Sequence, residues 1–215
     1  MPALLLGSIG VLAETSDLQR QSFNDAFAQA GLDWEWSRKD YAELLKSSGG
    51  QKRIEDEAKH RGQDVDAAAL HAMKSTLFQE RLDKGVDLRP GVAETIRDAR
   101  EQGWKVAFVS GTSRENVDAI LDATGLTRDR FDLITDASME AEPKPSPALY
   151  RLALAHLDME PQDALAVEDN PDGFAAAHGA EIDCIAFPGA LHDKGSFAGA
   201  RTIVDRLELK PIRAE

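Results

Sequence analysis

Side chains able to hold a phosphate group follow two short apolar runs of this sequence. Ser110-Gly111-Thr112 comes directly after residues 104–109, and a helical pattern begins just beyond it. A hydroxyl, a glycine that permits close approach and a helix start are the groups that bind phosphate in many proteins. Lys144 stands between two prolines after the run 132–135, where a stiff backbone could hold its positive charge in place. The triplet and the lysine together predict an anion-binding site.

A pair of adjacent acids closes a third apolar run. Glu168 and Asp169 end the stretch ALAVED, and carboxylates are ligands that Mg²⁺ accepts. Each feature also has an ordinary explanation. Thr112 and Glu115 could form a capping box, Lys144 could be an exposed loop lysine, and adjacent acids are common on protein surfaces. The order and separation of the three features together are more specific than any one of them.

The loop after the first apolar run carries no such group. Residues 3–6 lead into Gly7-Ser8-Ile9-Gly10, which holds no carboxylate, histidine, cysteine or lysine. If strand geometry continues, the Ser8 side chain points away from the direction of Gly7, because successive side chains alternate. We therefore expect this loop to offer no nucleophile.

The elements that position these residues form an alternating pattern from about residue 88 onward. Short apolar runs of strand length alternate with helical patterns that end at glycines or begin at Asn170-Pro171. The sequence predicts a doubly wound α/β fold whose parallel strands are covered on both faces, with ligands bound beyond the carboxyl ends of the strands. The expected strands are 3–6, 104–109, 132–135, 164–168 and 182–187, and the expected helices are 91–103, 113–125, 146–159 and 171–179.

Residues 14 to 85 interrupt this alternation with helical patterns alone. The first helix is expected to begin with a capping box at Ser16 and Gln19. Its buried face is expected to consist of Phe23, Ala26, Phe27 and Ala30, and Trp34 and Trp36 are expected to pack inside the same segment. The predicted organisation is an α/β core of residues 1–13 and 86–215 with an inserted helical cap of residues 14–85.

Composition narrows the possible partners. The chain has 215 residues and a net charge of −13, which disfavours nucleic acid and anionic membranes. Cys184 is the only cysteine, so no intrachain disulfide forms, and its apolar neighbours indicate a buried side chain. The five histidines show no metal-ligand spacing. No signal peptide or membrane span is visible, and a cytoplasmic location is expected.

Several stretches resemble a known family. The segments AFAQAGLDWEWSRKDYAELLKSSGGQKRI, LRPGVAETIRDAREQGWKVAFVSGTSRENV, KPSPALYRLAL, VEDNPDGFAAA and FAGARTIVDRL are similar to the haloacid dehalogenase superfamily. Within it, they most resemble the CbbY-like phosphatases and the β-phosphoglucomutases, in the branch with a helical cap after the first strand. The resemblance implies a Rossmann-like core, a phosphorylated small molecule as ligand and magnesium as cofactor.

The resemblance also implies roles for individual residues. Ser110, with Gly111, would hold the phosphoryl oxygens, and Lys144 would neutralise their charge. Glu168 and Asp169 would form the acidic motif that binds magnesium. Further contacts to the ligand are implied for a last group of residues: Arg53, Arg114 and Gln19, the last of which stands where relatives tend to have a histidine.

The first motif departs from the family pattern Asp-x-Asp-Gly-Thr/Val. Here the corresponding residues are Gly7-Ser8-Ile9-Gly10-Val11, so both aspartates are missing. The first would be the nucleophile and a magnesium ligand, and the second the general acid and base. Losing a nucleophile removes covalent catalysis, and losing a carboxylate predicts weak or absent magnesium binding.

Three functions remain open from the sequence. The first is a catalytically silent relative that binds a phosphorylated small molecule or a partner. The second is an active phosphatase or phosphomutase with a rerouted mechanism, in which Asp17 or Glu168 activates water. The third is a structural or interaction protein whose pocket is vestigial.

Overall fold

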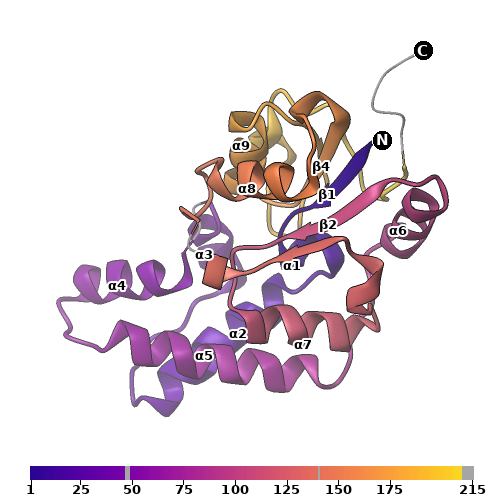
Figure 1. Ribbon diagram of the computed structural model, residues 1–215. Coiled ribbons are helices and arrows are strands. Elements are labelled where there is room, and N and C mark those ends of the chain that lie inside the picture. The colour runs from indigo at the N-terminus through magenta and orange to yellow at the C-terminus, as the bar shows by residue number, and fades with distance from the viewer. Residues whose placement is uncertain (47–48, 140, 210–215) are drawn as a thin grey trace.

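The computed structural model describes residues 1–46, 49–139 and 141–209. Its centre is a six-stranded sheet, in which all neighbouring strands run parallel in the order β3-β2-β1-β4-β5-β6 (Figure 1). The first strand by sequence therefore lies in the middle of the sheet. The strands are β1 (Ala3–Leu6), β2 (Lys105–Val109), β3 (Leu133–Thr135), β4 (Ala164–Glu168), β5 (Asp183–Ala186) and β6 (Thr202–Ile203).

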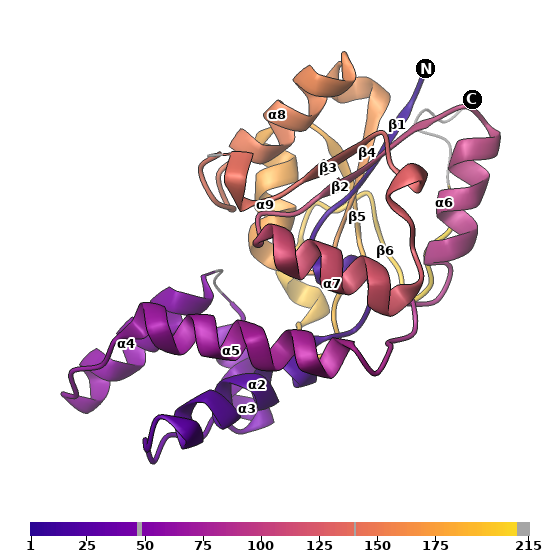
Figure 2. The same ribbon diagram turned by 60° about the horizontal axis from the view of Figure 1, so that its bottom comes forward.

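Helices cover both faces of the sheet, as Figure 2 shows. Alternate strand residues face opposite layers, because side chains of a strand alternate. Leu4 and Leu6 pack toward α6 (Val92–Glu101) and α7 (Arg114–Thr124), whereas Leu5 packs toward α8 (Ala148–Leu157) and α9 (Pro171–Gly179). This arrangement confirms the predicted doubly wound α/β fold.

The predicted core elements lie within two residues of the observed ones at nearly every boundary. Strands β1 and β4 match at both ends, and Asn170 caps α9 by accepting a hydrogen bond from the Gly173 N–H at 2.9 Å. The sequence does not predict the short 3-10 turns, nor two further elements, β6 and α1 (Ile9–Leu12). The edge strand β6 has only two residues, and α1 is a single helical turn, so neither is long enough to show a periodic pattern.

Residues 14–85 contain helices and, in the part that the structure describes, no strand. They pack around their own aromatic cluster, in which Phe23 and Phe27 contact Trp36 at ring-centre distances of 4.9 Å. We call residues 14–85 the cap and the remaining residues the core, and their division into two domains stays a prediction. The helices are α2 (Ser16–Gln29), α3 (Arg38–Leu44), α4 (Gly50–Arg61) and α5 (Ala67–Leu82).

Two details of the cap prediction are wrong. Ala30 is exposed, because α2 ends at Gln29 and Ala30 lies beyond the buried face. The capping box at Ser16 and Gln19 does not form, since the N-cap residue is Thr15 and makes no side-chain cap bond. The Gln19 side chain instead accepts a hydrogen bond from the Lys74 ammonium group at 2.7 Å.

The core contacts the cap through two segments. The end of α5 places Phe78 and Leu82 in the hydrophobic cluster of the core. From the other side, Leu191, in the loop after β5, packs against the aromatic cluster of the cap. Figure 1 shows helices α2 to α5 grouped at the lower left of the molecule. Among the helices that the structure describes, none is long and apolar enough to cross a membrane.

Candidate functional site

The strand register brings the predicted site loops together at the carboxyl edge of the sheet. Leu6 of β1 pairs with Phe108 of β2 on one side and with Val167 of β4 on the other. The chain leaves β1 with the Gly7 N–H donating to the Val167 carbonyl at 2.9 Å. The loop at Gly7 therefore lies between the residues that follow β2 and those that end β4.

Lys144 reaches this edge from the loop before α8. Its ammonium group lies 2.5 Å from Glu168 Oε1 and donates to the Val109 carbonyl at 3.0 Å. The Tyr150 hydroxyl donates to the same Glu168 oxygen at 2.8 Å. Glu168 is fully buried, so this ion pair is shielded from solvent. Lys144 is thus an internal counter-charge, and the alternative of an exposed loop lysine is wrong.

Burial shifts the pKa values of Glu168 and Tyr150. Removal from water raises the pKa of Glu168, and the Lys144 ammonium group opposes that rise. Burial also raises the pKa of Tyr150 well above its ordinary value, and the neighbouring Glu168 adds to the rise. The tyrosine therefore stays a neutral hydroxyl that donates to the carboxylate. Among the residues that the structure describes, Oε2 of Glu168 has no hydrogen-bond partner.

Glycines make room for both acids. A Cβ atom at Gly7 would lie 2.3 Å from Glu168 Cδ, and one at Gly173 would lie 2.2 Å from the same atom. A Cβ atom at Gly10 would lie 2.0 Å from Asp169 Oδ2. The Glu168 carboxyl therefore fills the space into which a side chain at position 7 would project.

Ser8 contacts the second acid. Its hydroxyl donates a hydrogen bond to Asp169 Oδ1, and the Asn170 amide nitrogen lies 2.9 Å from the same oxygen and 3.3 Å from Ser8 Oγ. The Ser8 side chain does point away from the Gly7 direction, because the two positions face different acids. Ser8 is the N-cap residue of α1 and not part of the strand, and whether the loop offers a nucleophile stays a prediction.

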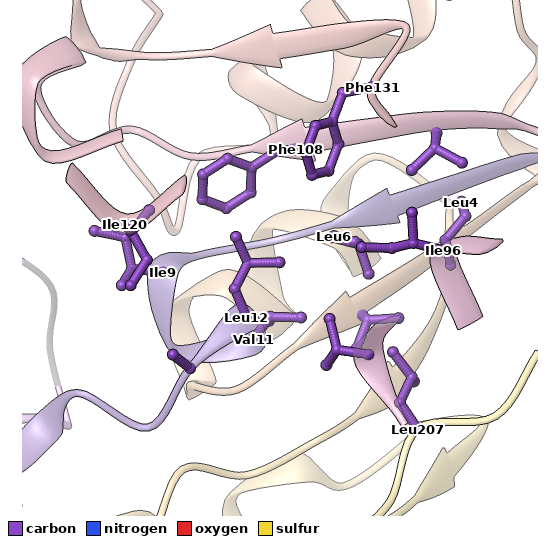
Figure 3. Close-up of a cluster of buried hydrophobic side chains, with 14 of the residues drawn as sticks. Leu4, Leu6, Ile9, Val11, Leu12, Ile96, Phe108, Ile120, Phe131 and Leu207 are labelled. Carbon is purple, nitrogen blue, oxygen red and sulfur yellow. The ribbon is translucent and has the colours of Figure 1, made fainter. Parts of the chain in front are cut away.

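Ile9 belongs to the core and not to the site. Its side chain is 6% exposed and packs in the cluster that contains Ile120 and Phe108 (Figure 3). An isoleucine here stabilises the loop by burial, but it cannot exchange a proton. Position 9 therefore contributes to the packing of the core and supplies no reactive group.

The acidic side chains near this edge have hydrogen-bond partners in the structure. Gly7 supplies no carboxylate, Glu168 is bound by Lys144 and Tyr150, and Asp169 is bound by Ser8. Within residues 1–46, 49–139 and 141–209, no three His, Cys, Asp or Glu side chains are arranged to hold a metal ion. The family resemblance implies magnesium, and Glu168 and Asp169 are the side chains that would hold it.

The second predicted motif lies beside the site. Ser110 is buried, and its hydroxyl accepts from the Thr112 N–H at 3.3 Å. Gly111 is exposed, and a Cβ atom placed there would lie 3.7 Å from Leu149. The capping box of Thr112 and Glu115 does not form, because Ser113 caps α7 by accepting from the Asn116 N–H. Arg114 is exposed as the first residue of α7.

The cap adds positive charge that the sequence analysis only partly identified. The Lys74 side chain is 4% exposed, bonds to Gln19, and lies between the rings of Phe23 and Phe78 at 4.8 and 4.9 Å. Burial and, to a smaller extent, the positive charge of Arg53 together lower the pKa of Lys74 to about 7. Gln19 and Lys74 thus form a bonded polar pair in the cap, and the charge of Arg53 acts on Lys74.

The side chain of Arg53 is bonded within the cap, and a charge of the core acts on it. Its guanidinium donates to the Leu44 carbonyl at 2.9 Å. Burial lowers its pKa, whereas Tyr41 and Asp172 oppose that effect. Asp172 lies in the first turn of α9, just beyond Glu168 and Asp169. The negative charge of this core residue therefore acts on Arg53 of the cap.

Lys74 and Tyr150 were missed, although both carry a signal. Lys74 lies on the buried stripe of α5 with Leu70, Phe78 and Leu82, where a lysine interrupts an apolar pattern at a spacing of four residues. Tyr150 lies on the buried face of α8 and resembles a core aromatic until its hydroxyl partner is known.

A cavity of about 600 Å³ lies elsewhere on the cap. Acidic side chains dominate its lining, and none of the predicted site residues contributes to it. The lining residues are Glu35, Trp36, Asp40, Glu43, Leu44, Glu57, His60 and Arg61.

Comparison with known proteins identifies the family. A family model described as haloacid dehalogenase-like hydrolase matches residues 9–181. Protein CbbY of Cereibacter sphaeroides is 41% identical over 209 residues, which cover 94% of this chain and 91% of the relative. Protein CbbY of Cupriavidus necator is 38% identical and covers 96% of this chain and 86% of the relative.

Solved structures agree with this relationship. CbbY from Rhodobacter sphaeroides in complex with phosphate superimposes with a TM-score of 0.89 at 40% identity, covering 96% of this chain and 95% of that one. A point mutant of the same protein in complex with xylulose-1,5-bisphosphate gives the same values. The chain therefore belongs to the haloacid dehalogenase-like hydrolases, in the branch of the CbbY-like phosphatases and β-phosphoglucomutases, with a first motif that has lost both aspartates.

Proposed function

We propose that this protein binds a phosphorylated small molecule of the sugar bisphosphate class and does not hydrolyse it. One phosphate would contact Ser110 and Lys144 at the edge of the sheet. The other would face the cap residues Arg53 and Lys74. The observation that carries the proposal is the buried Lys74, on which the positive charge of Arg53 acts in a chain of net charge −13.

Buried like charges favour an anion between them. Arg53 lowers the pKa of Lys74, which means that the two cations repel each other in the free protein. A phosphate placed near both would relieve that repulsion, and it would bind more tightly in a desolvated cap than in open solvent. The CbbY structures that contain phosphate and xylulose-1,5-bisphosphate support a ligand of this class.

Lys144 retains a donor for the first phosphate. An ammonium group has three N–H donors, and two of these are directed to Glu168 and the Val109 carbonyl. The third is available to a phosphate oxygen without breaking the buried pair. Glu168 offsets part of the positive charge, so the affinity at this end depends strongly on Ser110 as well.

Hydrolysis lacks its two reacting groups. Glycine at position 7 cannot attack phosphorus, and Ile9 is packed in the core. Phosphate monoesters are among the slowest compounds to hydrolyse unaided, so binding alone gives no useful rate. We also propose that magnesium binds weakly or not at all, because the remaining acids already have partners.

The rerouted phosphatase has less support. The Asp17 carboxylate accepts hydrogen bonds from Arg20 at 2.9 Å and from Gln21 at 3.0 Å, both on its own helix. It is therefore bound within the cap and not directed to the sheet edge. Glu168 is fully buried and bound by Lys144 and Tyr150, which leaves no path for water to Oε1. A structural protein with a vestigial pocket would bind no phosphorylated ligand, so a calorimetric titration distinguishes that hypothesis from our proposal.

The test combines calorimetric titration with a phosphate-release assay. We expect inorganic phosphate and xylulose-1,5-bisphosphate to bind, with the bisphosphate tighter, and no release of phosphate from a panel of sugar phosphates. Lys74→Met should weaken the bisphosphate more than inorganic phosphate, whereas Lys59→Met, an exposed lysine of α4, should weaken neither. Magnesium-dependent turnover that survives stringent purification would contradict the proposal, as would the absence of any binding.

A further inference from the structure

Ser8, Asp169 and Asn170 form a connected group at the carboxyl edge of β1 and β4. The Ser8 hydroxyl donates to Asp169 Oδ1, and the Asn170 amide nitrogen lies within hydrogen-bond distance of both. Asn170 is itself fixed, because its Oδ1 caps α9 through the Gly173 N–H. Ser8 is half-buried and Asp169 is 7% exposed, so the group is partly shielded from water.

This geometry is that of an activated nucleophile. A hydroxyl becomes nucleophilic when an adjacent base accepts its proton and a third group holds that base in place. Here Ser8 supplies the hydroxyl, Asp169 the base, and Asn170 the orienting amide. The Glu168 carboxyl, which is the other acid at this edge, is already bound by Lys144. We propose that Ser8 Oγ accepts a phosphoryl group from an acyl phosphate and becomes a phosphoserine.

The electron and proton balance selects the donor. The Ser8 oxygen forms a bond to phosphorus, its proton passes to Asp169, and the bond between phosphorus and the acyl oxygen breaks. The electron pair of that bond leaves with a carboxylate, which needs no proton to be a stable leaving group. A sugar phosphate would release an alkoxide instead, and position 9 holds a buried isoleucine with no proton to give.

The product is a stable modification. An aspartyl phosphate is an anhydride that water attacks readily, whereas a phosphoserine is an ordinary phosphate monoester that hydrolyses extremely slowly. The reaction therefore stops after one transfer per chain. Ser8 is then a modification site. The protein stays phosphorylated after it reacts with an acyl phosphate, and it does not hydrolyse sugar phosphates.

This inference rests on the proposed function to the extent that the phosphoryl group must bind near Ser110 and Lys144. The experiment incubates the native protein with acetyl phosphate and follows the intact mass, with peptide fragmentation to locate the added group. The same preparation is titrated with inorganic phosphate. Urea-denatured protein treated in the same way measures labelling that does not need the fold.

We expect one added phosphoryl group per native chain, located on Ser8, and none on the denatured chain. Ser8→Ala should abolish the label and Ser16→Ala should keep it, because Ser16 lies at the start of α2 outside this group. Asp169→Asn removes the proton acceptor and should slow labelling by about 100-fold. Localisation by fragmentation uses the unaltered chain, so it decides the question even if a variant fails to fold.

Asn170 is a positioning residue, and Asn170→Asp tests it separately. An aspartate keeps the oxygen that caps α9 but loses the amide donor to Ser8 and Asp169. Labelling should slow while the melting temperature and the affinity for inorganic phosphate stay near those of the unaltered chain. Equal labelling rates in the two proteins would show that the amide plays no part.

The outcomes separate the two proposals. If phosphate binds but no phosphoryl group is added, the role of Ser8 is wrong and the proposed function stands. If the added group is found on Glu168, Asp169 or another residue, the role of Ser8 is also wrong. If phosphate does not bind and no group is added, both proposals fail.

Discussion

The carboxyl group of Glu168 occupies the position from which a side chain at residue 7 would extend. Its Cδ atom lies 2.3 Å from an ideal Cβ at Gly7, and Lys144 and Tyr150 hold the carboxylate there. The missing side chain and the buried acid are therefore one structural unit. A side chain can return to position 7 only if Glu168 moves.

The first prediction concerns this steric relationship. Gly7→Ala should lower the free energy of unfolding by about 1–3 kcal/mol, because the added methyl group overpacks a buried site. Urea unfolding measures the change. Gly111→Ala is the matched control, since its Cβ would lie 3.7 Å from Leu149 in ordinary contact, and it should change the value by less than about 0.5 kcal/mol. Equal effects of the two substitutions would contradict the placement of Glu168.

A second prediction concerns the lost motif. Gly7→Asp combined with Ile9→Asp restores both carboxylates beside a retained Ser110 and Lys144. We expect a lower melting temperature, because Glu168 is displaced and a carboxylate enters the core position of Ile9. We also expect a magnesium-dependent release of phosphate from sugar phosphates that the natural chain lacks. A folded double variant without any such activity would show that more than the first motif has been lost.

The third prediction concerns the buried ion pair. Lys144→Met leaves the Glu168 carboxylate without its cation in a fully buried position. Breaking such a pair by removing one partner costs about 3–5 kcal/mol of unfolding free energy. Lys52→Met removes one partner of an exposed pair with Asp56 and should cost less than about 1 kcal/mol. A small loss in the Lys144 variant would mean that Glu168 is solvated or neutral.

The fourth prediction concerns pH. Lys74 has a pKa of about 7 in the folded protein, against 10.5 for the free group, so between these values the unfolded chain binds a proton that the folded chain does not. The free energy of unfolding should therefore rise with pH across this window, by up to about 1.4 kcal/mol per unit. Lys74→Met removes this contribution, so its stability advantage should be largest near or below about pH 7 and shrink toward about pH 9.

Thermal unfolding of the two proteins at several pH values measures this difference. Lys59→Met is the control, because Lys59 is exposed and its removal should leave the pH profile of the unaltered chain in place. A constant difference between the Lys74 variant and the unaltered chain would show that Lys74 stays protonated in the cap.

Most of the core could be predicted because its signals are local. Apolar strand runs, glycine stops such as Gly125, and the Asn170-Pro171 helix start each depend on a few neighbouring residues. The short elements α1 and β6 carry too few residues for a pattern. The predicted capping box of Ser16 and Gln19 is absent for a different reason. The Gln19 side chain accepts a hydrogen bond from the buried Lys74, which lies fifty-five positions away in the sequence.

The sequence by itself determined the family, the alternating α/β order, the polar residues at the carboxyl edge and the loss of both aspartates, because residue type and spacing record all of these. Only the tertiary structure decided what these residues contact. The Glu168 carboxyl fills the space beside Gly7, the Ser8 hydroxyl donates to Asp169, and the Lys74 ammonium group donates to Gln19. These contacts form because the fold brings distant segments within a few ångströms of each other. Those pairings depend on distances between elements, which no local pattern of residues contains.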